Sequence, residues 1–351
     1  MTMNNNSEAK TWQHKYNLIF TWVAIFALLA TGWQSMKQGY SQISEQFFIR
    51  DYLIQHYNQM RMDIGDRVFP PYVIVGPDGW LQHTFTDNID DFQKIIPLPE
   101  ARIRSFNKYM SLADVYGRKN NIQILIVVAP SKTTIYPDKL PSQIVPIGQT
   151  SRLDQMLESV STYSNIQILD LRSILIAARK EQDVYFITDS HWNQQGAYIA
   201  YSEVINSLSE KYPELQSYPL DAIPFTESYI TRDLSRIINA GYIPEKSMVR
   251  EKLPDFVKSQ QFQDHFGYHE STWIPGSTAP VALVYHDSFG YTYLNDYLLL
   301  NFSKAYFIHH QSEKLINPQT VERFQPNIII IEIVEWDLRA LSGILSALIT
   351  E

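Results

Sequence analysis

The segment VALVYHDSFG at residues 281–290 decides the fold, because five apolar residues lead without interruption into a histidine, an aspartate and a serine. A short apolar run of this kind is typical of a strand buried on both faces, as in a parallel sheet covered by helices. Ligands of open parallel sheets bind beyond the carboxyl ends of the strands. Ser288 follows such a strand, and we therefore expect it at the functional edge of an α/β domain.

The same pattern continues in both directions along the chain. Further apolar strands are predicted at residues 122–129, 166–169, 184–187, 305–308 and 328–334. Helices are predicted at residues 99–119 and 151–163, before residue 184, and after Asn193, which has the character of an N-cap. This alternation predicts a parallel sheet with helices on both faces. Residues 212–280 are rich in Pro, Ser and aromatic residues without clear periodicity, and we expect an irregular insertion there.

A second polar segment, TDSHWN at residues 188–193, follows the predicted strand at residues 184–187. Residues two apart in an extended chain point the same way, so the Asp189 carboxylate can face the His191 ring and set its tautomer. The other ring nitrogen is then free to take a proton from a hydroxyl. Together with Ser288 these residues supply a Ser-His-Asp site for acyl transfer.

The residues around Ser288 admit several roles. The start of a helix exposes backbone amides, and those of Ser288 and its neighbours Phe289 and Gly290 are candidate oxyanion donors that shape the site. Gly290 would also ease a tight turn. Asp287 could be the acid of the triad instead of Asp189, but its position beside the serine better suits holding the turn. An Asp-Ser pair after a strand can also be a simple helix cap.

The N-terminal region contains a long uncharged segment. No charged residue occurs between Lys15 and Lys37, and residues 17–33 read NLIFTWVAIFALLATGW. About 20 residues in a helix span roughly 30 Å, the thickness of the hydrocarbon core of a bilayer. We predict a cytoplasmic tail at residues 1–16, a single transmembrane anchor at 17–36, a stalk at 37–72 and a catalytic domain at 73–351. The alternative for residues 17–36 is a signal peptide cleaved near Ala30 or Gly32.

Bulk properties exclude several classes of function. A net charge of −8 without a basic stripe argues against nucleic acid as a partner, and the absence of cysteine excludes thiol catalysis and zinc-thiolate sites. His265 and His269 have the spacing of a metal pair but lack a helical pattern, so no metal is expected. His14, His56 and His83 are interpreted as surface or packing residues.

Several segments in this order resemble one known group of proteins. They are GPDGWL (76–81), APSKTTIYP (129–137), TDSHWN (188–193) with GA (196–197), RDL (232–234), HDSF (286–289) and PNIIIIE (326–332). They resemble the SGNH-hydrolase-like domain of the AlgJ/AlgX/AlgV group, which are periplasmic polysaccharide O-acetyltransferases best known from alginate. The resemblance covers nearly all of residues 76–340. The chain departs from the group at His286, where the group often has glycine. It also has no clear counterpart of the Gly and Asn blocks that supply oxyanion donors in ordinary SGNH enzymes.

The resemblance implies an SGNH-hydrolase-like fold with Ser288 as nucleophile, His191 as general base and Asp189 as its orienting acid. It implies that a multi-pass membrane acyltransferase supplies the acetyl group, that hydroxyls of an exported polysaccharide accept it, and that no cofactor takes part. The catalytic domain would lie in the periplasm, anchored to the inner membrane. Two alternatives stay open: a carbohydrate acetylesterase that uses the same site with water as acceptor, and a non-catalytic polysaccharide-binding scaffold.

Overall fold

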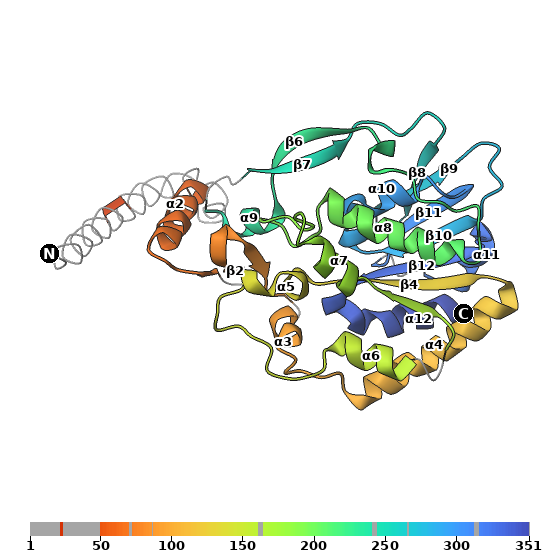
Figure 1. Cartoon of the computed structure of the whole chain (residues 1–351), viewed down its shortest axis with the longest axis horizontal. Coiled ribbons are helices and arrows are strands. Elements are labelled where there is room, and N and C mark those ends of the chain that lie inside the picture. Colours follow the sequence, from red (N-terminus) through yellow and green to blue (C-terminus); the bar gives the residue numbers. More distant parts are fainter. Residues whose placement is uncertain are drawn as a thin grey trace, which may run out of the picture. The chain divides into compact units, whose positions relative to one another are not determined.

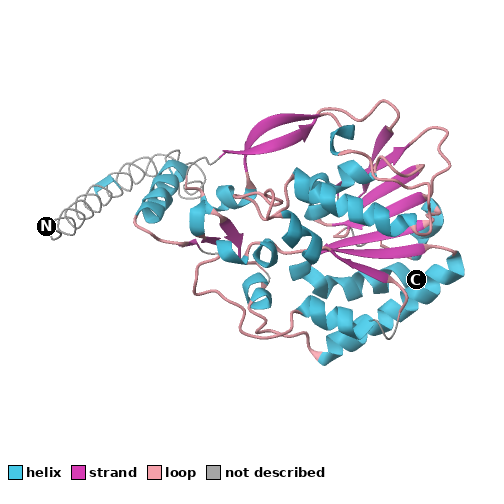
Figure 2. Ribbon diagram, in the orientation of Figure 1, coloured by secondary structure: helices cyan, strands magenta, loops and turns pink. Residues whose placement is uncertain are grey.

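The computed structural model describes residues 22–23, 50–69, 72–85, 87–160, 164–240, 244–264, 267–311 and 316–350 (Figures 1 and 2). The chain divides into two compact units, residues 1–60 and 61–351. The predicted anchor at residues 17–36 lies outside the described residues except for Trp22 and Val23. Among the helices that are described, none has both the length and the apolar character needed to cross a bilayer. The described end of the predicted stalk contains α2 (Arg50–Asp63).

A seven-stranded sheet forms the centre of the larger unit, with the strand order β5-β4-β12-β10-β11-β9-β8. Its five parallel strands are β5 (Gln167–Asp170), β4 (Gln123–Ala129), β12 (Ile328–Val334), β10 (Val281–His286) and β11 (Lys304–His309). Each of these strands is predicted by its apolar run, and the structure confirms all five. The sheet is nevertheless mixed, because β9 (Gly267–Trp273) and β8 (Lys258–Asp264) add to it antiparallel.

Two sequence-based predictions of strands and loops are wrong. Residues 184–187 do not join the sheet, and Tyr185 makes only an isolated antiparallel bridge to Trp192. The expected irregular insertion at residues 212–280 contains four strands, β8, β9 and the hairpin of β6 (Phe225–Thr231) and β7 (Pro244–Arg250). Mostly polar sequences hide these strands: even the buried positions of β9 are polar, namely His269, Ser271 and Thr272.

Helices cover both faces of the sheet, as the alternation predicts (Figure 2). Alternate strand residues point to opposite faces, so Leu125 and Val127 of β4 belong to one buried cluster while Ile126 and Val128 belong to the other. The first cluster includes side chains from α7 (Arg172–Ala178), α8 (Gln194–Ser209) and α10 (Asn295–Leu298). The second includes side chains from α4 (Glu100–Asn120), α6 (Arg152–Val160), α11 (Pro318–Phe324) and α12 (Leu341–Ile349).

Smaller elements surround this core. They are the three-stranded sheet of β1 (Val68–Phe69), β2 (Val73–Val75) and β3 (Leu81–His83), the helices α3 (Asn88–Phe92), α5 (Lys132–Ile135) and α9 (Asp233–Ile238), and short helical turns at Pro77–Gly79, Pro137–Lys139, Leu220–Ala222, Gly290–Leu294 and Glu335–Ala340.

The start of α8 packs directly on the segment that precedes it. Asn193 caps the helix as predicted, because its side-chain oxygen accepts a hydrogen bond from the Gly196 amide at 3.1 Å. Gly196 lies so close to the 184–192 segment that a Cβ there would be 2.1 Å from the Val184 carbonyl oxygen and 2.9 Å from the Trp192 Cβ. A glycine at this position therefore sets the distance between the helix and the segment that carries Asp189 and His191.

Gly196→Ala is expected to lower the free energy of unfolding by about 1–3 kcal/mol, because backbone atoms must shift to admit the methyl group. Gly343→Ala is the matched control: a Cβ on Gly343 of α12 meets no atom within 4 Å. That change should raise stability by about 0.5–1 kcal/mol through helix propensity. Urea denaturation measures both, and a Gly196→Ala variant as stable as the wild type would contradict this close packing.

Candidate active site

The structure brings together the three side chains that the sequence singles out. Ser288 directly follows β10 and Asp287 and is exposed, and His191 comes from the loop before α8. Nε2 of His191 lies 2.8 Å from Oγ of Ser288, across 97 positions of sequence. Nδ1 of His191 lies 2.6 Å from Oδ1 of Asp189, which also accepts the His191 amide at 3.1 Å. The three groups form a continuous hydrogen-bonded line from carboxylate to hydroxyl.

Electrostatics favour a charged Asp189 beside His191. Burial alone would raise the pKa of Asp189, but the hydrogen bond and charge of His191 hold that pKa well below its ordinary value. Burial also opposes an imidazolium, yet the hydrogen bond and charge of Asp189 raise the pKa of His191 above its ordinary value. With Nδ1–H donated to the carboxylate, Nε2 is the acceptor that faces the Ser288 hydroxyl.

Trp192 joins the two segments that carry these groups. Its indole Nε1 donates to the carbonyl oxygens of Phe289 at 3.1 Å and Thr292 at 2.8 Å. The indole is fully buried. The Phe289 ring also packs on His191, with the ring centroids 4.8 Å apart. These contacts fix the lateral position of the imidazole relative to the serine.

A buried lysine ties down the loop that carries Asp189. Lys132, at the start of α5, is only 4% exposed. Its ammonium donates to three backbone carbonyls, those of Leu81 at 2.7 Å, Ile187 at 2.8 Å and Asp189 at 2.9 Å. Burial lowers the pKa of Lys132 to about 7, against the opposing effect of Glu245 and Asp189. The ammonium thus connects the loop at residues 187–189 to Leu81 of β3.

Glu245 does the same for the amides of this loop. It stands on β7 in the insertion, and its carboxylate accepts the Ile187 amide at 2.6 Å and the Thr188 amide at 2.8 Å. The Thr188 hydroxyl donates to the same carboxylate at 2.7 Å. Sequence reasoning missed Glu245, which lies in a region without periodicity. Lys132 appears in the APSKTTIYP segment, but that segment carries no signal of the lysine's partners.

The start of α9 adds a second carboxylate and an arginine. Nη1 of Arg232 lies 3.7 Å from Oδ2 of Asp189, and its guanidinium stacks 3.7 Å from the centroid of Phe186. Asp233 accepts the Ser190 amide at 3.3 Å and the Ser190 hydroxyl at 3.0 Å. Burial and the charge of Asp189 raise the pKa of Asp233 to about 6.

Asp189, His191 and Asp233 bring potential metal-ligand atoms within 4.8 Å of one another. Oδ1 of Asp189 already accepts from His191, and both oxygens of Asp233 accept from Ser190. These contacts describe a hydrogen-bond network around the imidazole, and we assign it no metal. The other pair considered for a metal includes His265, which lies outside the described residues.

The turn at Ser288 corrects the expected oxyanion donors. Asp287 accepts the Phe289 amide at 2.7 Å and the Val334 amide at 2.8 Å, so it holds the turn and does not replace Asp189 as partner of His191. The Gly290 amide donates to Glu332 at 3.0 Å. Because both amides are donated to carboxylates, neither Phe289 nor Gly290 offers a free oxyanion donor. The Ser288 amide donates to neither carboxylate.

Gly290 is required for space and not for an unusual backbone angle. A Cβ there would lie 2.4 Å from the Cβ of His286 and 2.9 Å from Oε2 of Glu332. Among the described residues of this turn, Tyr293 has the positive φ, 69°. His286, the position that differs from the resembling group, is buried, and its ring Nδ1 bonds the Asp287 carbonyl at 2.8 Å. The imidazole therefore helps to hold the backbone of the turn through the Asp287 carbonyl.

Of the other histidines, His83 packs in the interior. It is 9% exposed, and its ring lies 4.4 Å from Phe85 and 5.4 Å from Trp336, centroid to centroid. Burial and the charge of His191 lower the pKa of His83 to about 4, so its imidazole is neutral. His56 is bonded to its own helix at the Tyr52 carbonyl, and His14 lies outside the described residues.

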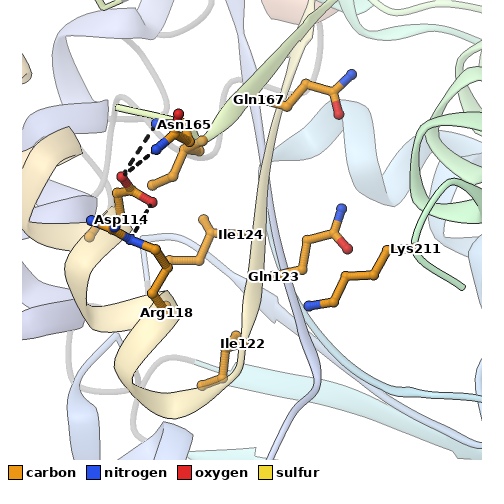
Figure 3. A pocket seen from close by; sticks show the side chains of 11 residues that line it. Asp114, Arg118, Ile122, Gln123, Ile124, Asn165, Gln167 and Lys211 are labelled. Atoms are coloured by element: carbon orange, nitrogen blue, oxygen red, sulfur yellow. Dashed lines mark hydrogen bonds and ion pairs between the residues drawn. The ribbon is translucent and has the colours of Figure 1, made fainter. Parts of the chain in front are cut away.

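A pocket shown in Figure 3 lies away from these residues. It is lined at the first residues of β4 and β5, where Gln123 and Gln167 stand, and by an ion-paired group in which Asp114 contacts Arg118 and Asn165. Ser288 follows the carboxyl end of β10, which runs parallel to β12 and through it to β4. The pocket therefore lies at the amino ends of the parallel strands, and Ser288 lies at their carboxyl ends.

Lys132→Met should lower the free energy of unfolding by at least about 3 kcal/mol, because three buried carbonyls lose their charged donor. Lys139→Met is the matched control, since the Lys139 ammonium also lies near the Trp80 ring but is ion-paired at the surface with Asp78. Its loss should cost less than about 1 kcal/mol. Urea denaturation of both variants measures the difference. Equal effects would show that the buried contacts of Lys132 contribute little.

Comparison with known proteins places the sequence among acetyltransferase domains. The family model described as the SGNH hydrolase-like domain of the acetyltransferase AlgX matches residues 73–284. The probable alginate O-acetylase AlgJ of Pseudomonas syringae pv. tomato is 24% identical over 143 residues, which cover 41% of this chain and 35% of that protein. The probable alginate O-acetylase AlgJ of Azotobacter vinelandii is 23% identical over 189 residues, 52% of this chain and 45% of that protein. The chain thus matches less than half the length of either relative.

Solved structures share the fold at low sequence identity. PatB1 of Bacillus cereus is 16% identical with a TM-score of 0.55, over 78% of this chain and 99% of that one. The O-acetyltransferase domain of Pseudomonas putida AlgJ is 17% identical with a TM-score of 0.50, over 78% and 92% of the two chains. The family match covers more than half of the chain and includes Asp189 and His191. The chain belongs to the family of SGNH hydrolase-like domains typified by the acetyltransferase AlgX.

Proposed function

We propose that this protein is a polysaccharide O-acetyltransferase that works through an acetyl-Ser288 intermediate. The observation that carries the proposal is the line from Asp189 through His191 to Ser288, with contacts of 2.6 Å and 2.8 Å. Membership of the AlgX-type family supports acetyl as the transferred group. The names of the AlgJ relatives support an exported, alginate-like polysaccharide as the acceptor.

In the first half-reaction, Oγ of Ser288 attacks the carbonyl carbon of the donor acetyl group while Nε2 of His191 takes the hydroxyl proton. Asp189 holds the tautomer and stabilises the imidazolium that forms. The former carbonyl oxygen becomes the oxyanion of the tetrahedral intermediate, and the Ser288 amide is its proposed backbone donor. The imidazolium then returns the proton to the leaving group, and acetyl-Ser288 remains.

In the second half-reaction, His191 takes the proton of a sugar hydroxyl, and the resulting oxygen attacks the acetyl carbonyl. The tetrahedral intermediate then collapses: the bond from the acetyl carbon to Oγ of Ser288 breaks, the imidazolium of His191 gives its proton to Oγ, and the acetylated sugar is released. Ser288 is exposed at the surface. An open position of this kind suits a long polysaccharide, whose hydroxyls must reach the serine without the polymer entering a deep cavity.

The proposal includes an acetyl donor and a location. The apolar segment at residues 17–36 supports an anchor in the inner membrane with the catalytic domain in the periplasm. Acetyl groups would then be supplied across the membrane by a multi-pass acyltransferase. The exposure of Ser288 also leaves water as a competing acceptor, and this observation keeps a carbohydrate acetylesterase as the second candidate.

Ser288→Ala should abolish acetyl turnover without loss of folding, because only the hydroxyl that forms the ester is removed. Full-length wild type and variant are incubated with p-nitrophenyl acetate, with and without oligosaccharides, and the sugars are analysed by mass spectrometry. Acetylated sugar that depends on Ser288 identifies the transferase, and free acetate alone identifies the esterase. Ser342→Ala, on α12, is the control and should keep full activity. Turnover by a folded Ser288→Ala variant would refute the assignment.

The pH dependence of kcat/KM should report His191. The base must be neutral, and Asp189 raises the pKa of His191, so the acid limb of the profile should lie above the ordinary histidine value of 6.5. Asp189→Asn removes the charge that raises this pKa, so the limb should move to lower pH. Its rate should also fall by about 10³–10⁴-fold because the tautomer is no longer held. An acid limb that stays in place in Asp189→Asn would contradict the role of Asp189.

A further inference from the structure

One buried carboxyl group beside the nucleophile has no part in the mechanism above. Glu332 interrupts the apolar strand IIIIEIV of β12 and is 0% exposed. Its Oε2 accepts the Asp287 amide at 3.0 Å and the Gly290 amide at 3.0 Å. These two amides lie on either side of Ser288 in the chain. A single oxygen atom thus holds both ends of the turn that presents the nucleophile.

Asp287 provides a second buried carboxyl group in contact with the first. It is 6% exposed, and each of its oxygens accepts one amide, from Phe289 and from Val334. The two buried carboxyl groups interact, because burial and the charge of Asp287 raise the pKa of Glu332, and Oε1 of Glu332 is buried without a hydrogen-bond donor. Two buried like charges would repel, so one of the two groups carries a proton.

The proton belongs on Glu332. Both amides that Glu332 accepts go to Oε2, and its Oε1 is buried without an amide partner. Both oxygens of Asp287 accept amides, which favours the ionised form of that group. Burial and the charge of Asp287 raise the pKa of Glu332 well above its ordinary value, in agreement with this assignment.

We propose that Glu332 is a positioning residue for acetyl transfer: a neutral carboxylic acid that holds the turn at Ser288 through Oε2 and donates its proton to ionised Asp287. The inference rests on the proposed function of Ser288. With the Phe289 and Gly290 amides held by this pair, Ser288 stays within hydrogen-bond distance of His191. The Ser288 amide is the one left to meet the oxyanion.

The titratable groups around the pair are neutral or belong to the site. His286 bonds the Asp287 carbonyl, and burial lowers its pKa to about 3. Burial raises the pKa of Tyr185, which interacts with both Glu332 and Glu335, and its hydroxyl is donated to the Pro130 carbonyl. Burial raises the pKa of Asp287, and the Phe289 and Val334 amides together with the charge of His191 oppose that shift and favour the ionised form.

The test uses two substitutions with opposite expectations. Glu332→Gln keeps an oxygen for the two amides and an N–H₂ in place of the proton, whereas Glu332→Leu removes both. Glu335→Leu is the matched control, because Glu335 is equally buried three residues on but bonds the Ser131 amide and the Thr134 hydroxyl instead. The readout is the rate at which phenylmethylsulfonyl fluoride modifies Ser288 in the full-length protein, followed by intact mass.

Glu332→Gln is expected to react within about threefold of the wild type, and Glu332→Leu at least about tenfold more slowly, since a small displacement of the nucleophile costs this much or more. Glu335→Leu should keep the wild-type rate in its folded fraction, which circular dichroism measures. A Glu332→Leu rate equal to the wild type would overturn the inference while leaving the proposed function intact. A folded wild type that is unmodified at Ser288 would overturn both.

Thermal unfolding tests the position of the proton even if Glu332→Leu does not fold. A carboxyl whose pKa is raised in the folded state stabilises the protein at low pH and loses that contribution as pH rises through the folded pKa. Glutamine does not titrate, so the Tm of Glu332→Gln should exceed that of the wild type by at least about 2 °C at pH 9 and by less at pH 5. A difference independent of pH would overturn the assignment of the proton to Glu332.

Discussion

The site depends on hydrogen-bond partners for the backbone of the loop that carries Asp189. Residues 187–189 lie outside the central sheet, and one backbone amide of β3, that of Leu81, donates to the Ile187 carbonyl. Buried backbone groups without partners are costly. Here the Lys132 ammonium donates hydrogen bonds to the carbonyls of Ile187 and Asp189. The Glu245 carboxylate accepts hydrogen bonds from the amides of Ile187 and Thr188. Charged side chains thus hold this loop, and the orientation of Asp189 and His191 follows from them.

Acidic side chains hold the turn at Ser288. Between the last residue of β10 and the helical turn that follows, the chain has to change direction within a few residues, and its amides face the interior. Asp287 and Glu332 accept them. Charged groups are rarely buried in a core unless they are paired or hydrogen-bonded, and perturbed pKa values gather at functional sites. An apolar residue at position 287 or 332 could not accept hydrogen bonds from these amides, which explains why costly polar groups are buried here.

The sequence predicts the core of the sheet and the proximity of Asp189, His191 and Ser288. Five apolar strands and the cap at Asn193 are local patterns, and the structure confirms them. Residues 184–187 have the apolar pattern of a strand, but their neighbours in space are side chains that no periodicity reveals. The amides of Phe289 and Gly290 were expected to face the reaction, and they face carboxylates instead. The partner of the Gly290 amide lies 42 positions away in sequence, whereas the Phe289 amide is bonded to Asp287 within the same turn.

Local patterns therefore determined the α/β class, the position of Ser288 beyond β10, and the pairing of Asp189 with His191 two residues later. Strand period and residue chemistry act over short stretches of chain, so the sequence contains them directly. Only the tertiary structure decided which amides stay free and which charges are buried. Lys132 reaches Asp189 across 57 positions, and Glu332 reaches Asp287 across 45. Buried polar groups tend to find partners, and in this site the partners lie on distant elements, so they become visible once the elements are packed together.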